Sequence, residues 1–164
     1  MHSKKFPSIK KNIICKIRRA KKSEAGKIQR LLAKYAEKKL LLPRSRENIE
    51  KNISSFKVAE KDGKIIGCCA VKDYGNALFE IRSLAVEKTL NGKGIGTKLV
   101  KRWISALKKK NARKIFALTY RPSLFEKIGF EIVSKELFPE KIWADCINCS
   151  KKDNCDEIAV LMKI

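Results

Sequence analysis

The chain has 164 residues, 44% of them hydrophobic, and its 39 Lys and Arg against 17 Asp and Glu give a formal net charge of +22. This length fits one compact domain, and the hydrophobic content excludes a wholly disordered chain because it can bury a core. The charge favours anionic partners, but lysines occur in every segment beside abundant Ile, which argues for a composition bias more than for a dedicated nucleic-acid surface.

Residues 1–12 form a basic N-terminal tail, and residues 13–164 are expected to form a single domain. No apolar run of signal-peptide length follows the tail, and none approaches the roughly 20 residues of a membrane helix. We therefore expect a cytoplasmic protein with no membrane partner. The sequence leaves the oligomeric state open, a homodimer included.

A strand and two helices are predicted first. The apolar run at 13–17 suits a short strand, and Ser23 is expected to cap a helix. The buried face of that helix recurs at i, i+3, i+4 and i+7 in Ile28, Leu31, Leu32 and Tyr35. The run at 40–43 ends this helix, and Ser45 is expected to cap a second, short one.

Three strands follow in the centre of the chain. Residues 56–60 alternate between apolar and polar side chains, and Asp62-Gly63 is a hairpin turn that leads into a strand at 65–71. A second turn at 74–76 precedes an apolar strand at 78–86. Hairpins, and not crossover helices, thus connect these strands.

A long helix and three further strands complete the predicted elements. The helix buries a stripe made of Ile95, Leu99, Trp103 and Leu107. A strand is expected at 115–118, a helix at 123–128 that Pro122 opens and Gly129 ends, and strands at 130–133 and 158–162.

A glycine-rich turn joins the strand at 78–86 to the long helix. Gly92, Gly94 and Gly96 let the main chain approach a bulky anion and direct several N–H groups at one point, where the helix dipole adds partial positive charge. The spacing is not that of a P-loop, and the hairpins upstream disfavour a dinucleotide-binding fold. A phosphate ligand suits this turn, while a helix start with a flexible entry is the simpler alternative.

The run 91–96 and the later run 123–130, which ends in Gly129-Phe130, resemble the two motifs of the GNAT (Gcn5-related) N-acetyltransferase superfamily. Asn91 departs from the Gln or Arg that begins the family's first motif. The resemblance implies an α/β (α+β) fold with a mixed, mostly antiparallel sheet of six to seven strands flanked by about four helices. It also implies acetyl-CoA as co-substrate, held by Leu84, Ala85, Val86, Asn91, Gly92, Lys93, Gly94, Ile95, Gly96, Thr97 and Phe125.

Acetyl transfer to an amine needs a base that takes a proton and a donor for the leaving thiolate. The resemblance places the thioester between the fourth and fifth strands, so Glu80 is the predicted base; the alternative is a strand residue that pairs with Arg82 for structural reasons only. Many GNAT enzymes use a Tyr where this chain has Phe125. Thr119 and Tyr120 are therefore the predicted acids, and direct transfer is implied.

The segment 41–46, the strand 80–86 and the run 118–121 resemble the acetyltransferase domains of N-acetylglutamate synthases. This resemblance implies L-glutamate as the substrate, whose two carboxylates suit guanidinium groups. The predicted substrate residues are Arg44, Arg82, Ser83 and Arg121. Another small amine or a peptide N-terminus is the alternative substrate, and a basic nucleic-acid-binding module is a remote alternative function.

Cys146, Cys149 and Cys155 have the spacing of a partial zinc site. A structural zinc requires four ligands, and these three Cys supply only three. The single His of the chain lies in the basic tail, so free thiols are favoured over a metal site. The sequence assigns Cys15, Cys68 and Cys69 to the core as small apolar residues.

Overall fold

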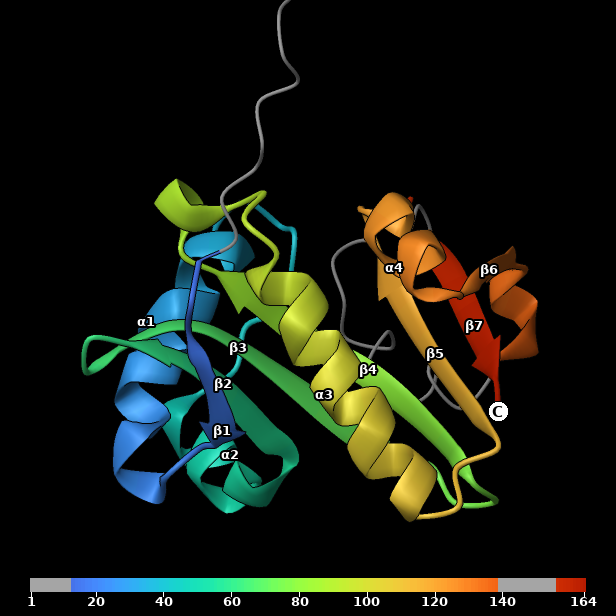
Figure 1. Ribbon diagram of the computed structural model, residues 1–164, viewed down its shortest axis with the longest axis horizontal. Coiled ribbons are helices and arrows are strands. Elements are labelled where there is room, and N and C mark those ends of the chain that lie inside the picture. Colours follow the sequence, from blue (N-terminus) through green and yellow to red (C-terminus); the bar gives the residue numbers. More distant parts are fainter. Residues whose placement is uncertain (1–12, 139–155) are drawn as a thin grey trace, which may run out of the picture.

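The computed structural model describes residues 13–138 and 156–164 and contains, within them, seven strands and four α-helices (Figure 1). The elements are β1 (Lys16–Arg19), α1 (Ala25–Ala36), α2 (Arg46–Lys51), β2 (Phe56–Lys61), β3 (Lys64–Asp73), β4 (Leu78–Val86), α3 (Ile95–Lys109), β5 (Lys114–Thr119), α4 (Pro122–Ile128), β6 (Glu131–Val133) and β7 (Ile158–Lys163). The predicted fold class is confirmed. The basic tail and the proposed zinc ligands Cys146, Cys149 and Cys155 lie outside the described residues.

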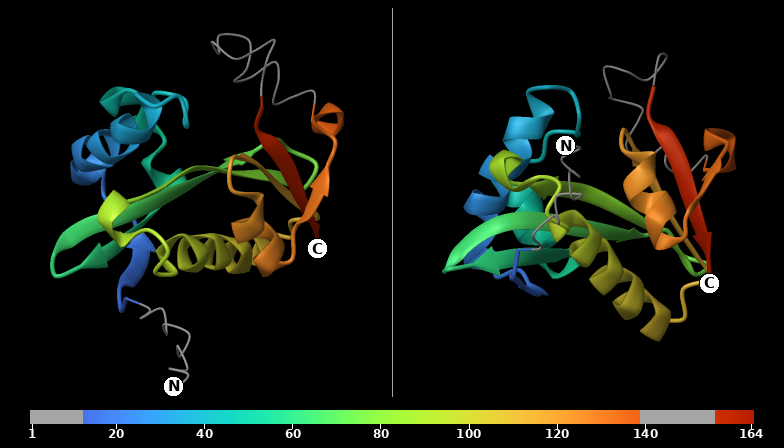
Figure 2. Two further views of the ribbon diagram at one scale, coloured as in Figure 1. Left: turned by 90° about the horizontal axis from the view of Figure 1, so that it is seen from above. Right: turned by 45° about the horizontal axis from the view of Figure 1, so that its top comes forward.

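The strands form one sheet in the order β1-β2-β3-β4-β5-β7-β6. Neighbouring strands are antiparallel except β4 and β5, which are parallel because α3 crosses over between them. Helices α1 and α2 cover one face of the sheet and α3 and α4 the other (Figure 2). None of the helices in the described residues is long and apolar enough to cross a membrane.

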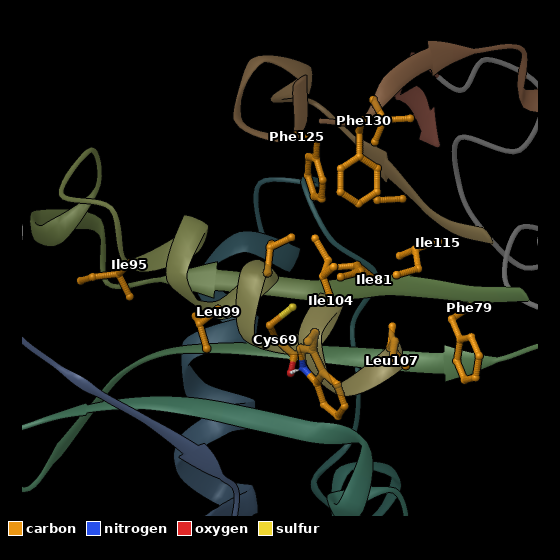
Figure 3. Close-up of a cluster of buried hydrophobic side chains, with 14 of the residues drawn as sticks. Cys69, Phe79, Ile81, Ile95, Leu99, Ile104, Leu107, Ile115, Phe125 and Phe130 are labelled. Carbon is orange, nitrogen blue, oxygen red and sulfur yellow. Dashed lines mark hydrogen bonds between the residues drawn. The ribbon is translucent and has the colours of Figure 1, made fainter. Parts of the chain in front are cut away.

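The predicted apolar stripe of α3 packs on the sheet (Figure 3). Leu99 and Leu107 have no exposed surface, and the indole N–H of Trp103 donates to the carbonyl of Cys69 at 3.0 Å. A Cβ on Gly67 would lie 3.2 Å from side-chain atoms of Ile95 and Leu99, so a larger residue there would require these side chains to shift by a few tenths of an ångström. This contact fixes the first turn of α3 against the sheet.

Two local predictions were wrong. The first strand begins at Lys16, so it contains Ile17 from the predicted run at 13–17 but not Ile14, which is 89% exposed. Ser23 does not cap α1, because it lies inside a short 3₁₀ turn at 22–24. Glu24 occupies the N-cap position of α1 without a side-chain cap, and its carboxylate accepts instead from the backbone N–H of Lys21 at 2.8 Å.

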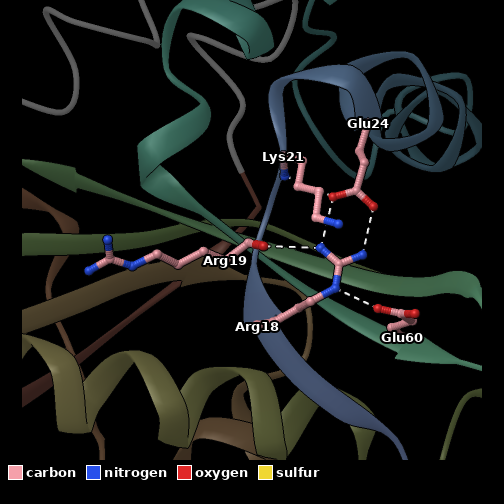
Figure 4. Close-up of polar contacts among 5 residues, drawn as sticks. All are labelled: Arg18, Arg19, Lys21, Glu24 and Glu60. Atoms are coloured by element: carbon pink, nitrogen blue, oxygen red, sulfur yellow. Dashed lines mark hydrogen bonds and ion pairs between the residues drawn. The ribbon is translucent and has the colours of Figure 1, made fainter.

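Arg18 links β1 to this helix start and to β2 (Figure 4). Its guanidinium donates to both carboxylate oxygens of Glu24, at 2.8 and 2.7 Å, and its Nε donates to Glu60. The Arg18 guanidinium lowers the pKa of Glu24, and Glu24 in turn is the main cause of a raised pKa of Arg18. The ion pair therefore stabilises the folded chain at neutral pH.

Arg18→Gln is expected to lower the free energy of unfolding by about 2 kcal/mol at pH 7, because the buried Glu24 would lose its cation. Since the folded-state pKa of Glu24 is depressed, its stabilising contribution is present above the ordinary pKa of a glutamate. It is lost as the pH falls through the lower, folded value, so the two proteins should become equally stable in acid. Urea unfolding of the wild type and the variant at several pH values measures the loss at pH 7 and its disappearance in acid.

The control is Arg46→Gln, which breaks an exposed pair with Glu50 on α2 and should change stability by less than about 0.5 kcal/mol. An equal loss in both variants, or a loss from Arg18→Gln that persists in acid, would show that the pair with Glu24 is not the cause.

Candidate active site

A bulge interrupts β4 near its middle. The ladder with β3 pairs Ala70 with Arg82 and Cys68 with Ala85, so Ser83 and Leu84 both lie opposite Cys69. Ser83 has φ of 50°, which is rare for a residue with a side chain. A bulge takes one residue out of the ladder and redirects its neighbours. The distortion falls at the peptide units predicted to orient the acetyl group, those of Leu84 and Ala85.

The parallel strands β4 and β5 diverge just before this bulge. Their ladder ends at the pair Glu80–Phe116, although β4 continues to Val86 and β5 to Thr119. Figure 1 shows the two strands separating from a common start. Beyond this pair the main-chain groups of β4 and β5 no longer bond to each other, along the segment where the sequence predicts the thioester.

The glycine-rich turn leads into α3 in the way the sequence predicts. Gly94 precedes the first helical residue with φ of 83°, and the first helical hydrogen bond runs from Lys98 N–H to the Gly94 carbonyl at 3.0 Å. The N–H groups of the first turn, at 95–97, therefore have no partner within the helix. No side chain caps them, and the first turn holds no acidic residue.

The space beside Gly92 in this turn is open. A Cβ on Gly92 would meet no atom within 4 Å, whereas one on Gly96 would lie 3.3 Å from Leu124 on α4. Gly92 thus faces open space, and Gly96 allows α4 to approach. These features fit a diphosphate held by main-chain N–H groups, and Lys93 and Thr97 belong to the same turn.

The C-terminal part of α1 holds this turn in place. The Tyr35 hydroxyl donates to the carbonyl of Val86, the last residue of β4, and Asn91 Nδ2 lies 3.5 Å from the same hydroxyl. Lys34 pairs with Glu87 at 3.2 Å. Asn91, the residue that departs from the family motif, therefore contacts α1.

A groove of about 640 Å³ lies between the segment 42–55 and strands β3 and β4. Its lining includes the predicted substrate residues Arg44 and Arg82, together with Lys72 and one acidic residue, Asp73. Asp73 also accepts from the backbone N–H of Gly75 at 2.8 Å. The charged side chains of the described lining are thus mainly cationic, which favours an anionic occupant.

Arg44 reaches the bulge from the start of α2. Ser45 caps α2 as predicted, with its hydroxyl accepting from Asn48 N–H at 3.1 Å. The Asn48 side chain does not complete a capping box; it accepts from Arg44 Nε at 2.9 Å. The Arg44 guanidinium also donates to the Ser83 hydroxyl at 3.3 Å and lies over the Phe56 ring. The structure therefore brings Arg44 and Ser83 together.

Glu80 is the most deeply buried acid of the described residues, with 1% of its side chain exposed. Its Oε1 lies 3.6 Å from Arg82 NH1, which confirms the pairing that the sequence offered as an alternative to catalysis. The Arg82 side chain is 17% exposed and lines the groove. Glu80 is not among the residues that line the groove, but its contact with Arg82 connects it to the groove, and a buried carboxylate in that position is a candidate general base.

The other predicted residues lie at the end of β5. The Tyr120 hydroxyl donates to Asp156 at 2.7 Å, and the Thr119 hydroxyl accepts from the N–H of Arg121 at 2.8 Å. Arg121 is exposed and is not among the residues that line the groove. The structure thus brings Arg44 and Arg82 to the groove, with Ser83 bonded to Arg44, but leaves Arg121 apart from it.

Phe125 packs edge-on against Phe130 and is 3% exposed, so its ring belongs to the core of α4; its part in holding a cofactor stays a prediction. Cys68 and Cys69 are buried as predicted, and burial raises the pKa of the Cys68 thiol to about 12 and also raises that of Cys69. Among residues 13–138 and 156–164, no three His, Cys, Asp or Glu side chains gather as a metal would need.

Sequence reasoning missed five polar residues of the groove: Asn48, Asn52, Ser55, Lys72 and Asp73. Lys72 stands opposite Glu80 in the β3–β4 ladder, a relation that appears only once the register of the hairpin is known. Alternation along β3 could have indicated that Lys72 shares a face with Ala70, but not that this face is hollow.

Comparison with known proteins gives consistent results. The family model described as the acetyltransferase (GNAT) domain matches residues 52–132. An uncharacterized N-acetyltransferase of Chlorobaculum tepidum is 42% identical over 145 residues, which cover 88% of this chain and 94% of the relative. An amino-acid acetyltransferase of Mycobacterium tuberculosis is 33% identical over 132 residues, covering 76% of this chain and 75% of the relative.

A solved structure of similar fold is the N-acetylglutamate synthase of Neisseria gonorrhoeae complexed with coenzyme A and N-acetyl-glutamate. It superimposes with a TM-score of 0.81 at 28% sequence identity and covers 93% of this chain. The chain spans only 36% of the length of that protein. The likeness therefore concerns one part of the larger protein.

Proposed function

Because the chain belongs to the GNAT acetyltransferase family and is an acetyl-CoA-dependent N-acetyltransferase, we propose that it acetylates the α-amino group of L-glutamate. The observation that carries the proposal is the groove beside the β4 bulge, which presents Arg44, Lys72 and Arg82. The similarity to the gonococcal N-acetylglutamate synthase supports the same substrate. In this assignment the chain catalyses the first step of arginine biosynthesis.

The charge of the groove supports an acidic amino acid over other amines. Guanidinium groups bind carboxylates through two parallel hydrogen bonds, so Arg44 and Arg82 suit the two ends of a dicarboxylate. Cationic amines would be repelled by the same three side chains. Another small amine or a peptide N-terminus is the alternative substrate.

The cofactor would be held mainly by main-chain groups. The N–H groups at 95–97, with Gly92 and Gly94 allowing close approach, would bind its diphosphate, and peptide N–H groups near the bulge would receive the thioester oxygen. Acetyl-CoA supplies an activated acetyl group whose thiol is replaced by the amine, with release of one proton.

The residues of the chain then divide the proton transfers. Glu80 takes a proton from the substrate ammonium group, directly or through water, and leaves a neutral nitrogen that can form the amide bond. Tyr120 or Thr119, at the end of β5, would donate a proton to the departing thiolate. The second nitrogen proton, lost as the amide forms, would then restore that hydroxyl, directly or through water. The proton on Glu80 returns to solvent.

The proposal is tested by following free thiol from acetyl-CoA with each of the twenty amino acids as acceptor. We expect turnover that depends on glutamate and exceeds that with glutamine, whose side chain carries no charge. Turnover with polyamines or a peptide N-terminus but not with glutamate would move the assignment to the alternative.

Arg44→Ala should raise the KM for glutamate by about 30-fold, equivalent to about 2 kcal/mol for a lost charge-assisted contact, and change the KM for acetyl-CoA far less. Initial rates with each substrate varied in turn give both constants. Arg46→Ala is the matched control, because Arg46 lies two residues away and pairs with Glu50 on the exposed side of α2. Equal changes in the two KM values would remove Arg44 from the substrate site.

A further inference from the structure

Arg82 is shared between the predicted base and the substrate groove. Its NH1 lies 3.6 Å from Glu80 Oε1, and the same side chain lines the groove. Both residues stand on β4 with one residue between them, so their side chains leave the strand on the same face. The charged groups facing the pair from neighbouring elements include Lys72, which stands opposite Glu80 on β3, and Arg44 from the start of α2.

This arrangement hinders the base while the groove is empty. A carboxylate with 1% of its side chain exposed is costly to bury without a cation, and Arg82 meets that need. The same contact opposes proton transfer, because the guanidinium faces the carboxylate oxygen Oε1, which would have to receive the proton. For Glu80 to accept a proton from the amine, its contact with Arg82 must first weaken.

We propose, on the basis of the proposed function, that the α-carboxylate of the substrate competes with Glu80 for the Arg82 guanidinium. This competition frees Glu80 to deprotonate the neighbouring ammonium group. A guanidinium has five N–H donors, and its charge is shared once a second carboxylate binds. Arg82 is thus a positioning residue that makes proton removal depend on recognition of an amino acid.

The test measures the wild type and Arg82→Gln with two amines, glutamate and 4-aminobutyrate. Glutamate and 4-aminobutyrate carry the same amine and the same distal carboxylate, but 4-aminobutyrate has no α-carboxylate. In the wild type we expect 4-aminobutyrate to have a low kcat even at saturation, because Arg82 stays on Glu80. Arg82→Gln should lower kcat/KM for glutamate, yet raise kcat for 4-aminobutyrate about fivefold, by removing the ion pair.

The outcomes distinguish failure of the proposed function from failure of the proposed role of Arg82. If the wild type does not acetylate glutamate, the proposed function fails before Arg82 is considered. If it does, and Arg82→Gln leaves kcat for 4-aminobutyrate unchanged or lowers it, Arg82 only binds substrate or only supports Glu80, and the inference is overturned. A thermal melt of each variant shows whether it is folded.

A second measurement covers the case in which Arg82→Gln does not fold. A crystal structure of the wild type with desulfo-coenzyme A and glutamate should show Arg82 bound to the α-carboxylate, with its separation from Glu80 increased beyond the ion-pair limit of about 4 Å. An Arg82–Glu80 contact retained at the present 3.6 Å, with the substrate carboxylate elsewhere, would overturn the inference.

Discussion

Glu80→Gln is expected to lower kcat for glutamate by about 10²–10⁴-fold, the usual contribution of a positioned general base. Gln has the shape of Glu and can still receive a hydrogen bond from Arg82, so the substitution removes the proton acceptor with little change in packing. The KM for acetyl-CoA should stay nearly constant because Glu80 lies on the substrate face of β4 and away from the turn at 92–96. Steady-state rates, with a thermal melt of the variant, measure this.

The matched control is Glu131→Gln, which changes an exposed glutamate on the edge strand β6 and should leave kcat unchanged. A loss of less than tenfold in Glu80→Gln would show that Glu80 is buried for structural reasons. The base would then have to be sought elsewhere, with bound water as the first candidate.

Gly94→Trp is expected to weaken coenzyme A binding by on the order of 100-fold, the loss of two hydrogen bonds to a charged group. An indole at the entrance to α3 would occupy the space in front of the N–H groups at 95–97. The variant should also lose roughly 1–2 kcal/mol of stability, because a residue with a side chain is strained at the φ of 83° found there. Isothermal titration and urea unfolding separate the two effects.

Gly63→Trp supplies the matching control, since Gly63 has φ of 75° in the β2–β3 hairpin and open space around it. Both variants should lose similar stability, and only Gly94→Trp should lose affinity. Normal affinity in Gly94→Trp would place the cofactor away from this turn and would remove the main support for the proposed mechanism.

The order of elements could be predicted from the sequence because the signals are local. Strand β4 has the predicted bounds, and the stripe of α3 is buried throughout, since periodicity reports directly which face of an element meets the core. The helix start at Ser23 was mispredicted because residues 22–24 form a 3₁₀ turn ahead of α1, where Glu24 is bound by Arg18 from β1. That partner comes from another element and could not be read from the segment itself.

The substrate groove was predictable in part. Arg44 and Arg82 were identified by resemblance, and the structure brings both to one groove. Lys72 and Asn52 were missed because their place depends on how the segment 42–55 lies across β3, a tertiary relation with no local signal. The bulge at Ser83 could not be predicted either, because serine has no particular preference for a positive φ within a strand.

The short parallel ladder between β4 and β5 has a consequence for the dynamics of the whole sheet. Three residue pairs, from Leu78–Lys114 to Glu80–Phe116, join the strands β1–β4 to the strands β5–β7. We expect amide hydrogens along this seam to exchange with deuterium sooner than those of the longer β2–β3 ladder, and to slow when a cofactor bridges the two halves. The bound ligand would then connect β4 and β5 where the two strands do not pair with each other.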